Sequence, residues 1–89
     1  MAYNSHDPKL TEQQEYALRA LLRGPRTSYQ VAVLIERNSL GAFSPTTGAT
    51  HHVLRRLEDR GFVRRVDTEP RNVWELTAKG RRSAEELAT

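Results

Sequence analysis

The sequence contains no cysteine. Disulfides, thiolate nucleophiles and cysteine-ligated zinc sites are therefore excluded, and the absence is consistent with a reducing compartment. The longest uninterrupted apolar run is 31–35, far short of the roughly 20 residues of a membrane-spanning helix. No apolar segment follows a basic start near the N-terminus, so no secretory signal is expected. These absences predict a cytoplasmic protein without a membrane partner.

Basic side chains are concentrated in one part of the sequence, although the net charge is only +3. Residues 46–82 contain nine basic and five acidic side chains, whereas residues 1–45 contain five and four. A basic excess within one stretch is typical of a surface that contacts phosphates. A solvated charged surface would give the same composition, so charge alone leaves both interpretations open.

The length of 89 residues predicts one small domain with a thin core. Residues 1–9 are polar and aperiodic, which predicts a flexible N-terminal arm. We expect a folded domain over 10–77. Residues 78–89 are expected to form a short C-terminal helix that is a possible dimer contact.

Two helices are expected in the first half of the domain. The first covers about 11–23, starting from a capping box of Thr11 and Gln14. The second is expected to start after Ser28 as its N-cap and to fade at 38–39. In the loop that follows, Leu40 and Phe43 are expected to contact the core.

A third helix is expected from Thr46 or Thr47 to about Arg60, before Gly61. At 100° per residue, one face collects Thr50, Val53, Leu54 and Leu57, and the opposite face collects His52, Arg55, Arg56 and Asp59. Such a helix buries one side and offers the other to a partner.

After Gly61 the pattern becomes strand-like. Residues 62–66 and 72–77 are rich in β-branched and aromatic side chains, and residues 67–71 supply turn chemistry, so a hairpin is expected. Thr77 can cap the last helix. The predicted fold is mainly α with a small β-hairpin: a winged helix-turn-helix with a three-helix core, a two-stranded wing and a short C-terminal helix.

This order of elements predicts binding of double-stranded DNA, because a helix fits the major groove while a hairpin reaches the adjacent backbone or minor groove. The candidate DNA-binding residues are Thr46, Thr47, Gly48, Ala49, His52, Arg55, Arg56, Arg64, Arg65 and Arg71. The arginines of the helix and strands would contact phosphates, and Arg71 at the wing tip would probe the minor groove. Thr46, Thr47, Ala49 and His52 would lie near base edges, and Gly48 would allow close approach.

The segments 48–63 (GATHHVLRRLEDRGFV), 74–80 (WELTAKG) and 21–31 (LLRGPRTSYQV) resemble the PadR-type winged-helix regulators. The resemblance covers about residues 15–82. It implies a transcriptional regulator, with repression the expected effect, that works in the cytoplasm and is associated with the bacterial nucleoid when bound to DNA. His51 stands where the family usually has tyrosine.

The family also has a long C-terminal helical region for dimerisation and often for effector response, and this sequence ends at Thr89. A small-molecule effector is therefore not expected. A weak homodimer is expected, because one recognition helix reads too few base pairs to specify a genomic site. Its contacts would come from 78–87, where Ala84 and Leu87 are the obvious apolar residues, together with the first helix and the N-terminal arm.

Other functions have less support in the sequence. His51 and His52 point about 100° apart on a helix, and no third ligand completes a metal site, so neither a metal nor another cofactor is expected. No catalytic constellation is evident, so the chain is not expected to be an enzyme. Trp74 and Tyr29 are interpreted as core residues. The alternative function is a winged-helix protein–protein interaction module in a larger nucleic-acid assembly, with RNA binding a third option.

Overall fold

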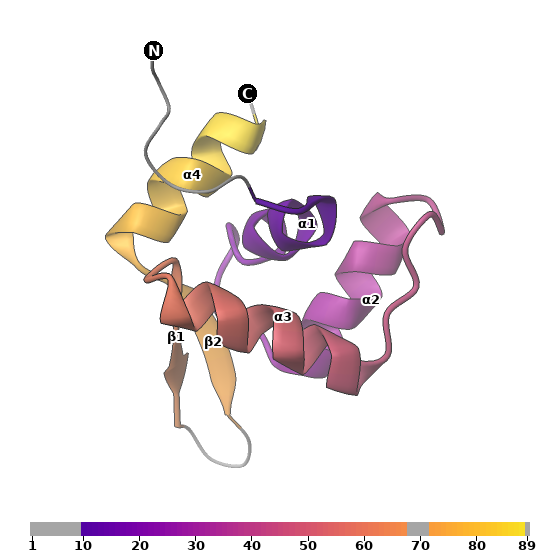
Figure 1. Cartoon of the computed structure of the whole chain (residues 1–89), viewed down its shortest axis with the longest axis horizontal. Helices are drawn as coiled ribbons and strands as arrows, with labels where there is room; N and C mark the ends of the chain where they lie inside the picture. The colour runs from indigo at the N-terminus through magenta and orange to yellow at the C-terminus, as the bar shows by residue number, and fades with distance from the viewer. Residues whose placement is uncertain (1–9, 68–71, 89) are drawn as a thin grey trace.

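The structure is a computed structural model that describes residues 10–67 and 72–88. Its elements, in chain order, are α1 (Glu12–Ala20), α2 (Ser28–Asn38), α3 (Thr47–Asp59), β1 (Val63–Val66), β2 (Val73–Leu76) and α4 (Ala78–Ala88) (Figure 1). This order confirms the predicted fold class. The predicted arm at 1–9 and most of the predicted turn at 67–71 lie outside the described residues. No helix within the described ranges is long and apolar enough to cross a membrane.

Side-chain caps fix where the first two helices begin. At α1 the predicted capping box is present: Gln14 N–H donates to Thr11 Oγ1 at 3.1 Å, and Thr11 N–H donates to Gln14 Oε1 at 3.0 Å. At α2 the predicted cap was wrong by one residue. Thr27, not Ser28, forms a second capping box with Gln30. The Ser28 hydroxyl is thereby left for a tertiary contact.

The helix ends show where local geometry overrides the apolar pattern. α1 ends at Ala20 rather than at the predicted residue 23, because the amides of Leu21 and Leu22 bond three residues back instead of four. At the end of α3, Gly61 adopts φ +83°. Its N–H donates to Glu58 O, and the next amide donates to Leu57 O, which is the Schellman arrangement.

The loop after α2 contradicts one prediction and confirms another. Leu40 was expected to contact the core, but it is 94% exposed. It occupies the left-handed position of a helix cap at φ 54°, with its N–H bonded to Arg37 O, and this backbone role turns its side chain to solvent. Phe43 does pack on the core, 5.9 Å from the ring of Tyr16.

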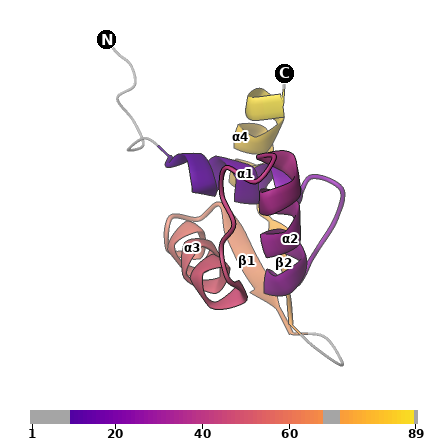
Figure 2. The same cartoon turned by 90° about the vertical axis from the view of Figure 1, so that its right-hand side faces the viewer.

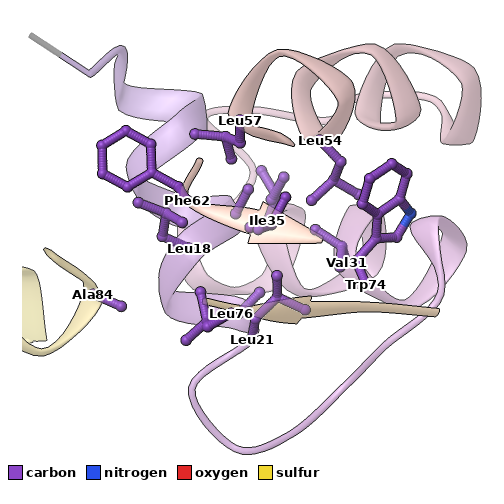
Figure 3. Close-up of a cluster of buried hydrophobic side chains, with 13 residues drawn as sticks. Leu18, Leu21, Val31, Ile35, Leu54, Leu57, Phe62, Trp74, Leu76 and Ala84 are labelled. Carbon is purple, nitrogen blue, oxygen red and sulfur yellow. The ribbon is translucent and has the colours of Figure 1, made fainter. Parts of the chain in front are cut away.

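One buried cluster joins all six elements. Its largest fully buried side chains are Trp74, Leu18, Leu21, Ile35, Leu54, Leu57, Val31, Val63 and Thr50, several of which meet in Figure 3. The predicted inward face of α3 is confirmed, with Val53 only partly buried. Trp74 is a core residue as predicted. Tyr29 is not: it is 61% exposed, because the buried stripe of α2 runs through Val31 and Ile35.

The hairpin is antiparallel, with Val63 opposite Leu76 and Arg65 opposite Trp74. Opposed residues share one face of a sheet, so the exposed Arg65 lies on the same face as the buried Val63, Trp74 and Leu76. A further backbone bridge joins Trp74 to Arg26 in the α1–α2 connection, with N–H···O distances of 3.0 and 2.8 Å. The wing is thus tied by its backbone to the segment before α2.

α4 packs against α1, and its first turn contacts the segment that follows α3. Thr77 caps it as predicted, accepting the Gly80 N–H at 3.1 Å. A Cβ at Gly80 would lie 1.8 Å from Phe62 O. Ala84 is fully buried. It therefore serves the core of this chain and is not free for the dimer contact suggested from the sequence.

We expect Gly80→Ala to destabilise the domain by about 3 kcal/mol, because the added methyl would overlap a backbone oxygen that cannot move independently. Gly48→Ala is the matched control: its Cβ would meet only Thr46 Oγ1 at 4.0 Å, so helix propensity should keep or raise stability. Urea unfolding of both variants measures the difference. Equal stabilities would contradict the docking of α4 on Phe62.

Candidate nucleic-acid interface

The solvent face of α3 carries most of the residues predicted to bind DNA. Thr46, Thr47, Gly48, Ala49, His52, Arg55 and Arg56 are all exposed. Thr46 has a second role as the helix cap, since its Oγ1 accepts the Ala49 N–H at 3.0 Å. The opposite face of the helix is fixed in the core by Leu54 and Leu57. α3 is therefore a rigid ridge with a polar, basic outer surface.

Arg55 and Arg56 stand on this ridge with their charges uncompensated. Within the described residues, neither forms an ion pair or a side-chain hydrogen bond. Gly48 lies in the first turn of the helix, where a Cβ would meet only Thr46 Oγ1, at 4.0 Å. The outer face thus combines two guanidinium groups that form no ion pair within the described residues with a first helical turn that contains a glycine.

The two wing arginines differ, which the sequence did not predict. Arg64 lies on the solvent face of the hairpin, and its Nε donates to Glu75 Oε2 at 2.6 Å. Arg65 lies on the other face, with its guanidinium carbon 5.8 Å from the centre of the Trp74 ring. Arg65 is therefore directed toward the junction with α3, and Arg64 away from it. Arg71 lies outside the described residues.

A small polar network joins the hairpin to α2 and α3. Trp74 Nε1–H donates to Ser28 Oγ at 3.0 Å, and the same hydroxyl lies 3.3 Å from His51 Nδ1. The His51 and Trp74 rings meet edge to face at 5.5 Å. One serine of α2 thus contacts both β2 and α3. Sequence reasoning missed this role, because it assigned the Ser28 hydroxyl to a helix cap.

The exposed Tyr29 was also missed as a surface residue. It follows Ser28 in the first turn of α2, and its side chain is exposed to solvent. Only the burial pattern of α2, with 31, 32 and 35 inward, could have indicated this from the sequence.

Acidic and histidine side chains do not gather into a metal site. Among the described residues, no group of three or more His, Asp or Glu side chains could hold a metal ion. His52 is exposed on α3, while His51 turns toward Trp74, so the two adjacent histidines diverge as the helical geometry predicts.

A family model described as the transcriptional regulator PadR-like family matches residues 17–86. The match includes the end of α1, all of α2, α3 and the hairpin, and most of α4. The chain belongs to the PadR-like family. This membership confirms the resemblance drawn from the sequence and places the chain among transcriptional regulators rather than enzymes. The comparison with curated proteins found no match.

Solved structures of regulators share the fold of this PadR-like chain. Lactococcus lactis ZitR in complex with DNA superposes with a TM-score of 0.75 at 23% identity, over 99% of this chain and 57% of ZitR. A transcriptional regulator from Clostridium thermocellum gives 0.71 at 15% identity, over 90% of this chain and 85% of that one. MepR, which regulates the Staphylococcus aureus multidrug efflux pump MepA, gives 0.71 at 23% identity over 90% and 56%. The chain therefore spans little more than half of ZitR and MepR.

We expect Ser28→Ala to destabilise the domain by about 1–3 kcal/mol, because it leaves the buried indole N–H of Trp74 without an acceptor. Ser44→Ala, at an exposed loop position, should change stability by less than about 0.5 kcal/mol. Thermal unfolding of the two variants provides the comparison. If both melt like the parent, the indole N–H does not depend on Ser28.

Proposed function

We propose that this PadR-like chain represses transcription by binding double-stranded DNA, with α3 in the major groove and the hairpin beside it. The observation that carries the proposal is the outer face of α3, where Arg55 and Arg56 remain unpaired beside an open helix start. Such a ridge fits a groove about 12 Å wide. The chain would act in the cytoplasm, at the bacterial nucleoid.

Phosphate contacts in this arrangement come from Arg55, Arg56 and Arg65. Arg65 is added to the α3 pair because the hairpin register directs it toward α3. Arg64 can contribute only after it exchanges Glu75 for a phosphate, and Arg71 would act at the wing tip. That the fold is shared with ZitR, whose structure is in complex with DNA, supports the proposal.

Base edges would be read by Thr47, Ala49 and His52, with Thr46 available through its hydroxyl hydrogen. These side chains lie on the exposed side of the first turns of α3. Thr and His offer hydrogen bonds, and Ala49 offers a methyl contact to thymine. Gly48 allows the helix backbone to approach the duplex closely.

A protein-docking function has less physical support. The exposed large apolar residues among those described are Tyr29 and Leu40, and neither lies on α3. Protein interfaces are generally centred on buried aromatic or aliphatic anchors. The outer face of α3, with threonine, histidine and arginine, offers no such anchor.

We expect Arg55→Ala and Arg56→Ala each to weaken binding to all duplexes and to reduce the slope of log K against log salt by about 0.9, the value for one lost phosphate contact. Arg81→Ala, an exposed position on α4, is the control for net charge and should leave the slope nearly unchanged. Fluorescence anisotropy at several salt concentrations measures all three. Unchanged slopes in both α3 variants would place the DNA surface elsewhere.

We also propose a weak homodimer that DNA tightens, with half-sites about 10 base pairs apart. Since Ala84 is buried and the outer surface of α4 carries 81, 82, 85 and 86, the contact would rely on α1 and Leu87 rather than on an apolar face of α4. Sedimentation should show a monomer when the protein is free and two protomers on a pseudo-palindromic duplex. A single protomer on such a duplex would refute the dimer.

A further inference from the structure

A cavity of about 420 Å³ lies between the end of α1, the α1–α2 connection and the second half of α2. Its lining consists of Arg19, Ala20, Leu22, Arg23, Arg26, Leu34, Arg37 and Asn38. Four of these eight side chains are arginines, and no carboxylate is among them. The volume is within the roughly 300–1,000 Å³ range of small-molecule sites.

Two of the four arginines are held in place by the protein. The guanidinium of Arg19 lies over the Tyr16 ring, 4.6 Å from its centre, and its Nε is buried without a hydrogen-bond partner. A buried donor left unpaired is unfavourable, so an acceptor at this position would stabilise the side chain. Arg26 donates from Nε to Ala20 O at 3.1 Å, which orients its guanidinium and leaves other N–H groups free.

The other two arginines form the rim. Arg23 and Arg37 are exposed, and neither forms an ion pair within the part of the chain that the structure describes. Four like charges that line one cavity repel one another, and an anion bound among them would reduce this repulsion. Because guanidinium groups bind carboxylates and phosphates through two parallel hydrogen bonds, this cluster suits a ligand with several anionic oxygens.

The cavity is separate from the proposed DNA surface. In Figure 2 the α1–α2 connection and α3 lie on opposite sides of α2. A duplex on the outer face of α3 would therefore leave the cavity open. Its concave shape also differs from the ridge of α3 and admits a compact molecule.

We propose that this cavity binds a small polyanion, either a phosphorylated metabolite or a polycarboxylate. Arg19 and Arg26 provide the preorganised floor, and Arg23 and Arg37 close over the ligand from the rim. Leu22 and Leu34 also line the cavity, and their apolar side chains disfavour a ligand with a large polar part. The sequence did not predict such a site, because the four arginines are spread from 19 to 37 and converge only in the fold.

The test is an amide NMR titration of the full chain with sodium pyrophosphate and, separately, with sodium citrate, at constant ionic strength. Saturable shifts should concentrate at 19–26 and 34–38. The double variant Arg23→Gln/Arg37→Gln should weaken binding by about tenfold, because it removes two charge-assisted contacts. The matched control Arg81→Gln/Arg82→Gln removes the same charge from α4 and should bind like the parent.

A response to only one probe supports the site and identifies its ligand as phosphate-like or carboxylate-like. The proposal is overturned if neither probe gives saturable shifts, or if both double variants weaken binding equally, since net charge alone would then explain it. It is also overturned if a DNA duplex shifts the cavity amides while both small anions fail to do so. None of these results depends on α3 being the DNA-binding helix.

Discussion

The burial of Trp74 is the interaction on which the geometry of the DNA-binding surface depends. Its backbone bridges Arg26, its indole N–H donates to Ser28, and its ring meets the edge of His51. These contacts come from the α1–α2 connection, α2 and α3. One residue of the wing, through its backbone and its side chain, thus fixes the hairpin against three other segments. In a domain with so small a core, few other contacts could hold the hairpin in its orientation relative to the helices.

The same contact explains why Arg65 and Arg64 differ in spite of being neighbours. Because Trp74 faces the core, its cross-strand partner Arg65 must lie on that face too, at the junction with α3. Arg64 is forced to the opposite face, where Glu75 neutralises it. Strand alternation therefore places one of these two arginines on the face of Trp74, toward the proposed DNA surface, and the other on the opposite face. Composition alone treats the two as equal.

The fold could be predicted largely from local patterns. The Thr11 capping box, the apolar stripe of α3 and the stop at Gly61 each depend on residues within a few positions of one another, and each was confirmed. The exposed candidates on α3 were correctly placed on one face for the same reason. Local periodicity specifies which side of a helix is buried, and hence which side is not.

The sequence did not show which side chains would make contacts with residues far away in the chain. Ser28 could act as a cap by its position, but the indole of a residue 46 positions away takes its hydroxyl. Leu40 is apolar, but its left-handed backbone turns it to solvent. Ala84 is among the few apolar residues of α4, and packing against α1 buries it. In each case a tertiary contact or a backbone requirement overrides the preference of the residue type.

With α3 in the major groove as proposed, its side-chain chemistry would limit how much sequence information one protomer can read. In the first turns of the helix, Thr47 and His52 are exposed with polar groups able to reach base edges, while Gly48 and Ala49 add only close approach and a methyl. A good bidentate base contact discriminates by about 1–3 kcal/mol, whereas specific sites are typically preferred over non-specific DNA by about 4–10 kcal/mol. Arginine contacts to phosphate cannot supply the difference, because they are independent of sequence. A second recognition helix would supply this difference in free energy. Since Ala84 is buried within the chain, the contact between the protomers of the proposed dimer would rely on α1 and Leu87.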